Sequence, residues 1–234
     1  MGNIAHPTQA DYERSMNDCR FSLCGAALAA LPSGALWWPD AGLLAVADLH
    51  FGKAERMARR QGLMLPPWEA EATLDRLAAD LEATGAREVI CLGDSFDDLA
   101  AGAALPEAAR LRLTALIAGR RWVWIMGNHD PGPLNLGGTW LTEVTQDALT
   151  FRHEAQAGAV GEVSGHYHPK LALPGTGGAR PCFLYDSRRL ILPAYGAFTG
   201  GLSARDPVVA ALFGPPAFAV LTGPRAILAP FAVR

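Results

Sequence analysis

Histidine, aspartate and asparagine side chains recur along this chain in a succession of short polar blocks. The blocks read Asp48-Leu49-His50, Gly93-Asp94, Gly127-Asn128-His129-Asp130, His153 and Gly165-His166-Tyr167-His168. Imidazole nitrogens and carboxylate oxygens are the groups that hold divalent transition-metal ions in proteins. If the fold brings the blocks together, they predict a site for two metal ions and the hydrolytic chemistry that such a pair promotes.

Each block stands at the end of a short apolar run. The runs cover residues 43–47, 88–92, 122–126, 149–152 and 160–164. Short apolar runs bounded by polar residues or glycine are typical of buried strands. We therefore predict a strand before every block, which places the blocks at the carboxyl ends of the strands.

Two stretches between the blocks have the apolar spacing of a helix. Leu74, Leu77, Ala78 and Leu81 lie at i, i+3, i+4 and i+7. This spacing predicts a helix that Pro66-Pro67 opens and Gly85 ends, and a second helix is expected from Pro106 to Gly119. Alternating strands and helices predict an α/β fold with a largely parallel sheet, where ligands gather at the carboxyl ends of the strands.

The remaining segments are expected to complete the sheets. Residues 20–38 and 182–231 are strand-like and punctuated by glycine and proline, and residues 174–180 and 196–207 are loop candidates. Half of the 234 residues are apolar, enough for a substantial core. We predict one domain over residues 1–234.

The order of the blocks resembles that of the calcineurin-like metallophosphoesterase superfamily, whose motifs read D-x-H, G-D-x-x-D/H, G-N-H-D/E, H and G-H-x-H. This resemblance covers residues 48–168. It implies two facing mixed β-sheets flanked by α-helices, a four-layer αββα sandwich with the site at the strand ends. It also implies a ligand set in which Asp94 bridges two ions, Asp48, His50 and His168 complete one site, and Asn128, His153 and His166 complete the other.

The expected chemistry is hydrolysis of a phosphate ester. Two divalent ions clamp a phosphate and supply a hydroxide. Mixed oxygen and imidazole ligands suit manganese or iron, and zinc stays open. His129 is expected to be the general acid that protonates the leaving oxygen. By resemblance to protein phosphatases of the superfamily, Asp97 is expected to orient His129, although Asp97 and Asp98 also fit a solvated acidic turn.

Asp98 is a departure from the protein phosphatases, which carry a phosphate-binding arginine at this position. A carboxylate there is expected to repel a phosphomonoester dianion more than a diester, which has one negative charge. The sequence therefore favours a phosphodiesterase over a phosphatase.

Three longer stretches narrow the resemblance to one subfamily. Residues 43–54, 161–170 and 192–202 are similar to the bacterial ligase-associated DNA damage response endonucleases, also called PdeM. This resemblance implies a manganese-dependent phosphodiesterase that acts on DNA in repair, beside a ligase, a helicase and an exonuclease. Two alternatives stay open: an enzyme that cleaves a small nucleotide or nucleotide-sugar ester, and a scaffold that has lost catalysis, although this chain keeps every expected ligand.

Candidate substrate contacts lie outside the metal blocks. Lys53 and Arg56 are expected to hold a backbone phosphate, or else to be surface charge. Four aromatic residues, Phe51, Tyr167, Tyr195 and Phe198, are candidates for stacking on bases or for packing. Trp122 and Trp124 alternate in one predicted strand and are expected to pack in one layer.

Charge and composition bear on how the chain would bind DNA and on where in the cell it would be found. A formal net charge of −3 argues against broad basic DNA binding and predicts weak, salt-sensitive association. The chain begins without a signal-peptide pattern, has no apolar stretch of membrane-spanning length, and its four cysteines are expected to be buried thiols. A cytoplasmic protein without membrane association is expected.

Overall fold

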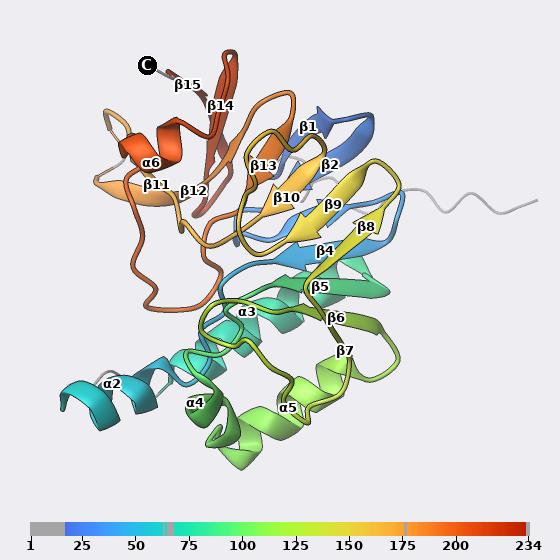
Figure 1. The fold of residues 1–234 in the computed structure, drawn as a ribbon, viewed down its shortest axis with the longest axis vertical. Helices are drawn as coiled ribbons and strands as arrows, with labels where there is room; N and C mark the ends of the chain where they lie inside the picture. Colours follow the sequence, from blue (N-terminus) through green and yellow to red (C-terminus); the bar gives the residue numbers. More distant parts are fainter. Residues whose placement is uncertain (1–16, 63, 65–67, 176, 233–234) are drawn as a thin grey trace, which may run out of the picture.

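Two mixed β-sheets face each other in the computed structural model, which describes residues 17–62, 64, 68–175 and 177–232 (Figure 1). The first sheet runs in the order β1 (Cys19–Leu23), β2 (Ala26–Ala30), β3 (Leu36–Trp38), β4 (Leu43–Val46), β5 (Glu88–Leu92), β6 (Arg121–Ile125) and β7 (Thr139–Leu141). Strands β1 to β4 pair antiparallel, and β4 to β7 pair parallel.

The second sheet is also mixed. Its order is β15 (Ile227–Phe231), β14 (Ala217–Leu221), β12 (Ala179–Tyr185), β13 (Arg189–Ile191), β10 (Glu162–Ser164), β9 (Leu149–Arg152) and β8 (Glu143–Gln146), with β11 (Lys170–Ala172) beside β12. Strands β9, β10 and β13 are parallel, whereas β12, β14 and β15 are antiparallel to their neighbours. The parallel part of each sheet carries the polar blocks.

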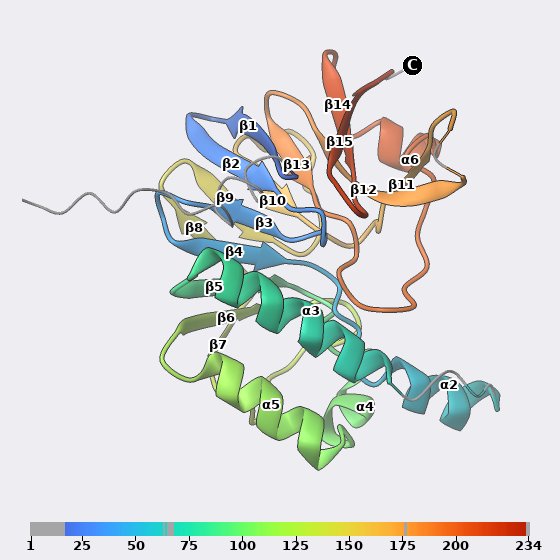
Figure 2. The same cartoon turned by 180° about the vertical axis from the view of Figure 1, so that it is seen from behind.

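Helices cover the outer faces. Helices α3 (Glu69–Thr84) and α5 (Glu107–Ile117) lie along the first sheet, as Figure 2 shows. The short helix α6 (Pro207–Ala210) and β11 cover part of the second sheet. Helix α2 (Lys53–Gln61) follows the first polar block and projects from the body in both views, and α4 (Leu99–Ala103) lies beside it.

Alternating side chains of the strands build three separate cores, one between the sheets, one under α3 and α5, and one under α6 and β11. In β4, Leu43 and Ala45 point into the core between the sheets, while Leu44 and Val46 point into the core under α3 and α5. This strand is buried on both faces, which is why it reads as a continuous apolar run. Trp122 and Trp124 pack together in the core under the helices, as expected, with ring centroids 5.5 Å apart.

The expected strands before the blocks and both expected helices are present. Helix α3 ends at Gly85, which has a left-handed backbone with φ 63°, whereas the expected opening at Pro66-Pro67 lies outside the described residues. The sheets are more antiparallel than expected, because the flanking strands are joined by hairpins. The loop expected at 174–180 is shorter, since β12 begins at Ala179.

The structure bears on two further expectations, one about the burial of the cysteines and one about membrane-spanning segments. Cys91 and Cys182 are buried thiols as expected, but Cys24 is exposed, because it lies in the turn between β1 and β2. In the part of the chain that the structure describes, none of the helices has both the length and the apolar character needed to cross a membrane. One domain over residues 1–234 stays a prediction.

Candidate metal centre

The five polar blocks lie together where strand ends of both sheets meet. Strands β4, β5 and β6 of the first sheet lead into Asp48, Asp94 and Asn128, and strands β9 and β10 of the second sheet lead into His153 and His166. A parallel bridge between Ala47 and Ala194 joins the segments at this junction. The centre therefore depends on both sheets.

One group of side chains contains Asp48, His50 and His168, whose ligand atoms lie within 4.8 Å of one another. His50 Nε2 and His168 Nε2 face each other at 3.4 Å. Asp48 Oδ1 is 3.1 Å from His168 Nε2, yet among the described residues this buried oxygen has no partner with hydrogen-bond geometry. A buried oxygen and two facing ring nitrogens are expected around a cation.

A second group contains Asp94, His153 and His166. His153 Nε2 lies 3.4 Å from Asp94 Oδ2 and 3.1 Å from His166 Nδ1. The amide oxygen of Asn128 lies 2.9 Å from the same His153 nitrogen. The four side chains expected on the second ion thus surround one point.

The ring orientation of His153 is set by a main-chain contact. His153 Nδ1 lies 2.9 Å from the carbonyl oxygen of Leu92. Because a carbonyl only accepts, Nδ1 carries the hydrogen and donates it, which leaves the lone pair of a neutral ring on Nε2. That lone pair points into the second group of side chains.

The electrostatics of this group favour a cation. Burial lowers the pKa of His153, but the hydrogen bond with Asp94 and the charges of Asp48 and Asp94 outweigh burial and raise it to about 9. Burial raises the pKa of Asp94, but its hydrogen bond and charge interaction with His153 lower it to about 2. The carboxyl group of Asp94 is therefore ionised at neutral pH, and the negative charge that attracts a proton to His153 would attract a metal ion in the same way.

Asp48 connects the two groups. Its Oδ2 accepts a hydrogen bond from the main-chain nitrogen of His166 at 2.9 Å, and its Oδ1 lies 4.0 Å from His153 Nδ1. Asp94, the bridging ligand implied by the family resemblance, has its side chain in the second group of contacts. Bridging by Asp94 stays a prediction.

Five of the expected ligands have a left-handed backbone: Asp48 (φ 54°), His50 (φ 48°), Asp94 (φ 46°), His166 (φ 72°) and His168 (φ 46°). Residues other than glycine rarely adopt this conformation, and such strain concentrates at functional sites. The sharp turns direct alternate side chains of short loops toward the centre.

Glycines before the ligands make room for this packing. A Cβ at Gly93 would lie 2.3 Å from His153 Nδ1, and one at Gly127 would lie 2.2 Å from Asp94 N. A Cβ at Gly165 would lie 2.6 Å from Asp48 Oδ2. The glycine of each motif is thus required by close approach of another block.

Asp130 is a site residue to which sequence reasoning assigned no role. Its fully buried carboxylate accepts hydrogen bonds from the main-chain nitrogens of Asp94, Ser95, Phe96 and Gly127 at 2.7–3.1 Å. Burial raises the pKa of Asp130 to about 6, against the lowering effect of these bonds. This carboxylate fixes the loop after β5 to the loop after β6, and its position directly after the Gly-Asn-His motif was the available signal.

His129, the expected general acid, lies beside the first group of ligands. Its ring is edge-on to His50 with centroids 5.2 Å apart, and its main-chain nitrogen donates to Asp94 Oδ1 at 2.8 Å. Its Nδ1 donates to the main-chain carbonyl of Asp97 at 2.8 Å. Nε2 is therefore the atom left to carry a transferable proton.

Asp97, which is expected to orient His129, contacts that ring through its main chain. The contact is made by its carbonyl oxygen, whereas its buried carboxylate lies 2.9 Å from His50 Nδ1 and 3.0 Å from the guanidinium of Arg56. Burial raises the pKa of Asp97, but the His50 and Arg56 contacts outweigh burial and lower it. The carboxylate thus orients an expected metal ligand, as a partner of histidine ligands commonly does.

The carboxylate of Asp98 should repel a phosphomonoester less strongly than the sequence suggested. It caps the start of α4 by accepting from Ala101 N at 2.7 Å. Its Oδ2 also lies 2.8 Å from Arg59, 3.2 Å from Arg60 and 3.8 Å from Arg56. Because these arginines compensate its charge, Asp98 is a weak argument against a phosphomonoester.

The expected phosphate contacts, Lys53 and Arg56, lie in the first turn of α2, directly after the first block. Arg56 is 25% exposed and already pairs with Asp97, so only part of its guanidinium faces solvent. Both roles stay predictions.

These donors fit a pair of divalent ions. The two groups supply carboxylate, amide and imidazole atoms, the mixture that suits manganese, iron or zinc. A buried carboxylate oxygen without a hydrogen-bond partner and a lone pair fixed by a main-chain carbonyl are the particular observations that support this fit.

Comparison with known proteins agrees with this geometry. Residues 42–182 match the model of the family described as calcineurin-like phosphoesterase. Comparison with curated proteins found no match. Among solved structures, the chain is similar to the Pseudomonas putida nuclease MPE, with a TM-score of 0.73 and 29% identity over 92% of this chain and 100% of that chain. The family predicted from the motifs and the arrangement of two mixed sheets with flanking helices are confirmed, and the chain belongs to the calcineurin-like phosphoesterase family.

Proposed function

We propose that the chain is a metal-dependent phosphodiesterase that cleaves DNA. The observation that carries this proposal is the convergence of two groups of ligands beside His129 at the junction of the sheets. Similarity to a solved nuclease supports nucleic acid as the substrate.

Seven side chains would hold the two ions. Asp48, His50 and His168 would bind one, Asn128, His153 and His166 the other, and Asp94 would be shared. When bound, such a pair polarises the phosphoryl group and lowers the pKa of water toward neutrality. Manganese is the metal that we expect, with iron or zinc as alternatives.

His129 acts at the leaving group. The carbonyl of Asp97 holds its Nδ1, so its Nε2 gives the proton to the departing oxygen. Asp97 keeps the ring of His50 in place through its carboxylate. Lys53 and Arg56 hold a neighbouring phosphate of the strand, since they stand at the start of the helix that follows His50.

Association with DNA is expected to be weak and to decrease steeply with salt. The chain has a net charge of −3, and the arginines of α2 pair with Asp97, Asp98 and Glu55. A partner that delivers the substrate would compensate for this weakness. The ligase, helicase and exonuclease implied by the resemblance are the candidates.

The test compares hydrolysis of an aryl phosphodiester, the matching monoester and DNA by the manganese-loaded protein. We expect turnover of the diester and of DNA, little turnover of the monoester, and none with His153→Ala purified in the same way. Turnover of the monoester alone would indicate a phosphatase. Turnover of the diester without cleavage of any DNA would indicate an enzyme for small nucleotide esters.

A further inference from the structure

The segment from Tyr195 to Leu202 crosses the metal centre and is fixed at both ends. At its start, Tyr195 N donates to Ala47 O at 2.8 Å and Gly196 N to Asp48 O at 3.2 Å. At its end, Leu202 N donates to Tyr167 O at 3.3 Å. A Cβ at Gly201 would lie 2.2 Å from the carbonyl oxygen of His168. This centre-crossing loop therefore lies against both the first and the last metal block.

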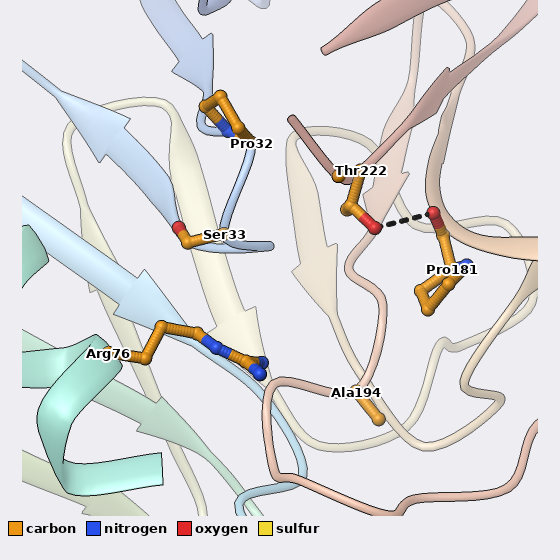
Figure 3. A pocket seen from close by; sticks show the side chains of 7 residues that line it. Pro32, Ser33, Arg76, Pro181, Ala194 and Thr222 are labelled. Carbon is orange, nitrogen blue, oxygen red and sulfur yellow. Dashed lines mark hydrogen bonds between the residues drawn. The ribbon is translucent and has the colours of Figure 1, made fainter. Parts of the chain in front are cut away.

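Helix α3 supports the first half of the centre-crossing loop with a row of polar side chains. Thr73 Oγ1 accepts from Ala197 N at 3.0 Å, and Arg76 donates to the carbonyl oxygen of Tyr195 at 2.6 Å. The hydroxyl of Tyr195 donates to Asp80 at 2.7 Å. Figure 3 shows Arg76 reaching from α3 into the pocket that Ala194 lines. The loop is thus held before any substrate binds.

Phe198 stands at the middle of this fixed loop. The hydroxyl of Thr199 donates to the carbonyl oxygen of Gly196 at 3.0 Å, which closes a turn around it. Phe198 has a left-handed backbone with φ 59°, a rare conformation for a bulky residue. Its neighbour Ala197 lines the same narrow crevice as His50. The turn therefore holds Phe198 in the middle of a loop whose two ends lie against the first and the last metal block.

Exposure separates Phe198 from the other aromatic candidates. Phe51, Tyr167 and Tyr195 are 1%, 9% and 0% exposed and pack in the interior, whereas Phe198 is 51% exposed. The left-handed backbone costs stability, and a half-exposed ring forgoes the stabilisation that full burial would give. Backbone strain of this kind clusters at active sites and ligand clamps.

We propose that Phe198 is a stacking platform for a base of the nucleic-acid substrate, next to the phosphodiester that is cleaved. This inference rests on the proposed nuclease function. Every base has an aromatic face, so stacking tolerates any sequence. Because the loop is fixed in advance, little conformational entropy is lost when a base stacks.

The test measures kcat/KM for a single-stranded oligonucleotide and for the same strand with abasic sites around the cleaved bond. The preference for the strand with bases is the ratio of the two values. We expect Phe198→Ala to lower this preference about 5- to 150-fold, the effect of losing one stacked base. Phe198→Trp should keep the preference, and Phe198→Leu, which is apolar but not aromatic, should lose it.

A binding measurement reports stacking directly. The fluorescence of 2-aminopurine in the strand should be quenched when it binds to His129→Ala, and the quenching should be lost when Phe198→Ala is added. If the wild type cleaves both strands and Phe198→Ala has the same preference as the wild type, the stacking platform would be overturned and the nuclease function would stand. Failure of the wild type to cleave any strand would overturn the nuclease function and the platform with it.

Discussion

At the scale of single residues, His129 has one ring nitrogen bound to a carbonyl and one left for the reaction. We expect His129→Ala to lower kcat about 10²- to 10⁴-fold for diesters with a poor leaving group, the usual contribution of a general acid. A nitrophenolate leaves without a proton, so its release should be slowed much less. The measurement is kcat across a series of aryl diesters, and an equal loss for every leaving group would contradict the assigned role.

Gly165 tests the close packing of the blocks. Gly165→Ala places a Cβ 2.6 Å from Asp48 Oδ2, so one of the two segments must shift. We expect a loss of about 1–3 kcal/mol in the free energy of unfolding, the typical cost of overpacking, together with weaker metal binding. Gly214→Ala is the matched control, since its Cβ would have its nearest atom at 3.9 Å. Equal behaviour of the two variants in denaturant titrations would exclude the packing role.

The gathering of these side chains was predictable from the sequence, because each polar block follows an apolar run. Asp130 was not predictable as an anchor, because its partners Asp94, Ser95 and Phe96 lie 34–36 positions earlier in the chain. Asp97 was expected to orient His129; its carbonyl oxygen contacts His129 and its carboxylate contacts His50, a division that only the turn of the loop decides.

At the scale of elements, α3 links the helix layer to the centre. Thr73→Val removes the acceptor for Ala197 N and leaves that half-buried donor unpaired, which costs up to about 3 kcal/mol. We expect faster hydrogen exchange at Ala197 and a lower kcat/KM for DNA. Thr114→Val is the matched control, because Thr73 and Thr114 each donate to the carbonyl four residues earlier, but Thr114 lies on the exposed face of α5. Unchanged exchange at Ala197 would contradict the supporting role of α3.

Glu69 at the start of α3 gives the fold a pH dependence. Its buried carboxyl accepts from Ala54 N at 3.0 Å, and burial raises its pKa to about 7 from 4.5. The folded state therefore holds this proton more tightly than the unfolded state, so its contribution to stability is present below pH 4.5 and is lost as pH rises through 7. The difference in stability between wild type and Glu69→Gln should change across this window in denaturant titrations. A difference that is constant from pH 4.5 to 8 would contradict the assignment.

Helices with a clear period were predictable, as α3 and α5 were, and so were the short strands that end at a polar block, whereas other short elements were not. Strands β7, β8 and β11 and helix α4 have three to five residues each, too few to establish a period. Helix α2 has no buried residue, so no apolar stripe marked it.

At the scale of the whole molecule, the centre joins the two sheets. The first sheet carries Asp48, His50, Asp94 and Asn128, and the second carries His153, His166 and His168. Ions held by both would stabilise the folded chain by mass action. We expect manganese to raise the thermal midpoint of unfolding and a chelator to reverse the effect. If manganese concentrations that restore activity leave the thermal midpoint of unfolding unchanged, the result would argue against ligands from both sheets.

The central claim is that this junction holds two ions with Asp94 between them. Electron paramagnetic resonance during a manganese titration of the metal-free protein tests it most directly, because neighbouring ions with a shared ligand are magnetically coupled. The account predicts two ions per chain with a coupled spectrum, and loss of the coupling in Asp94→Ala. A single ion per chain, or two ions with independent spectra, would contradict it.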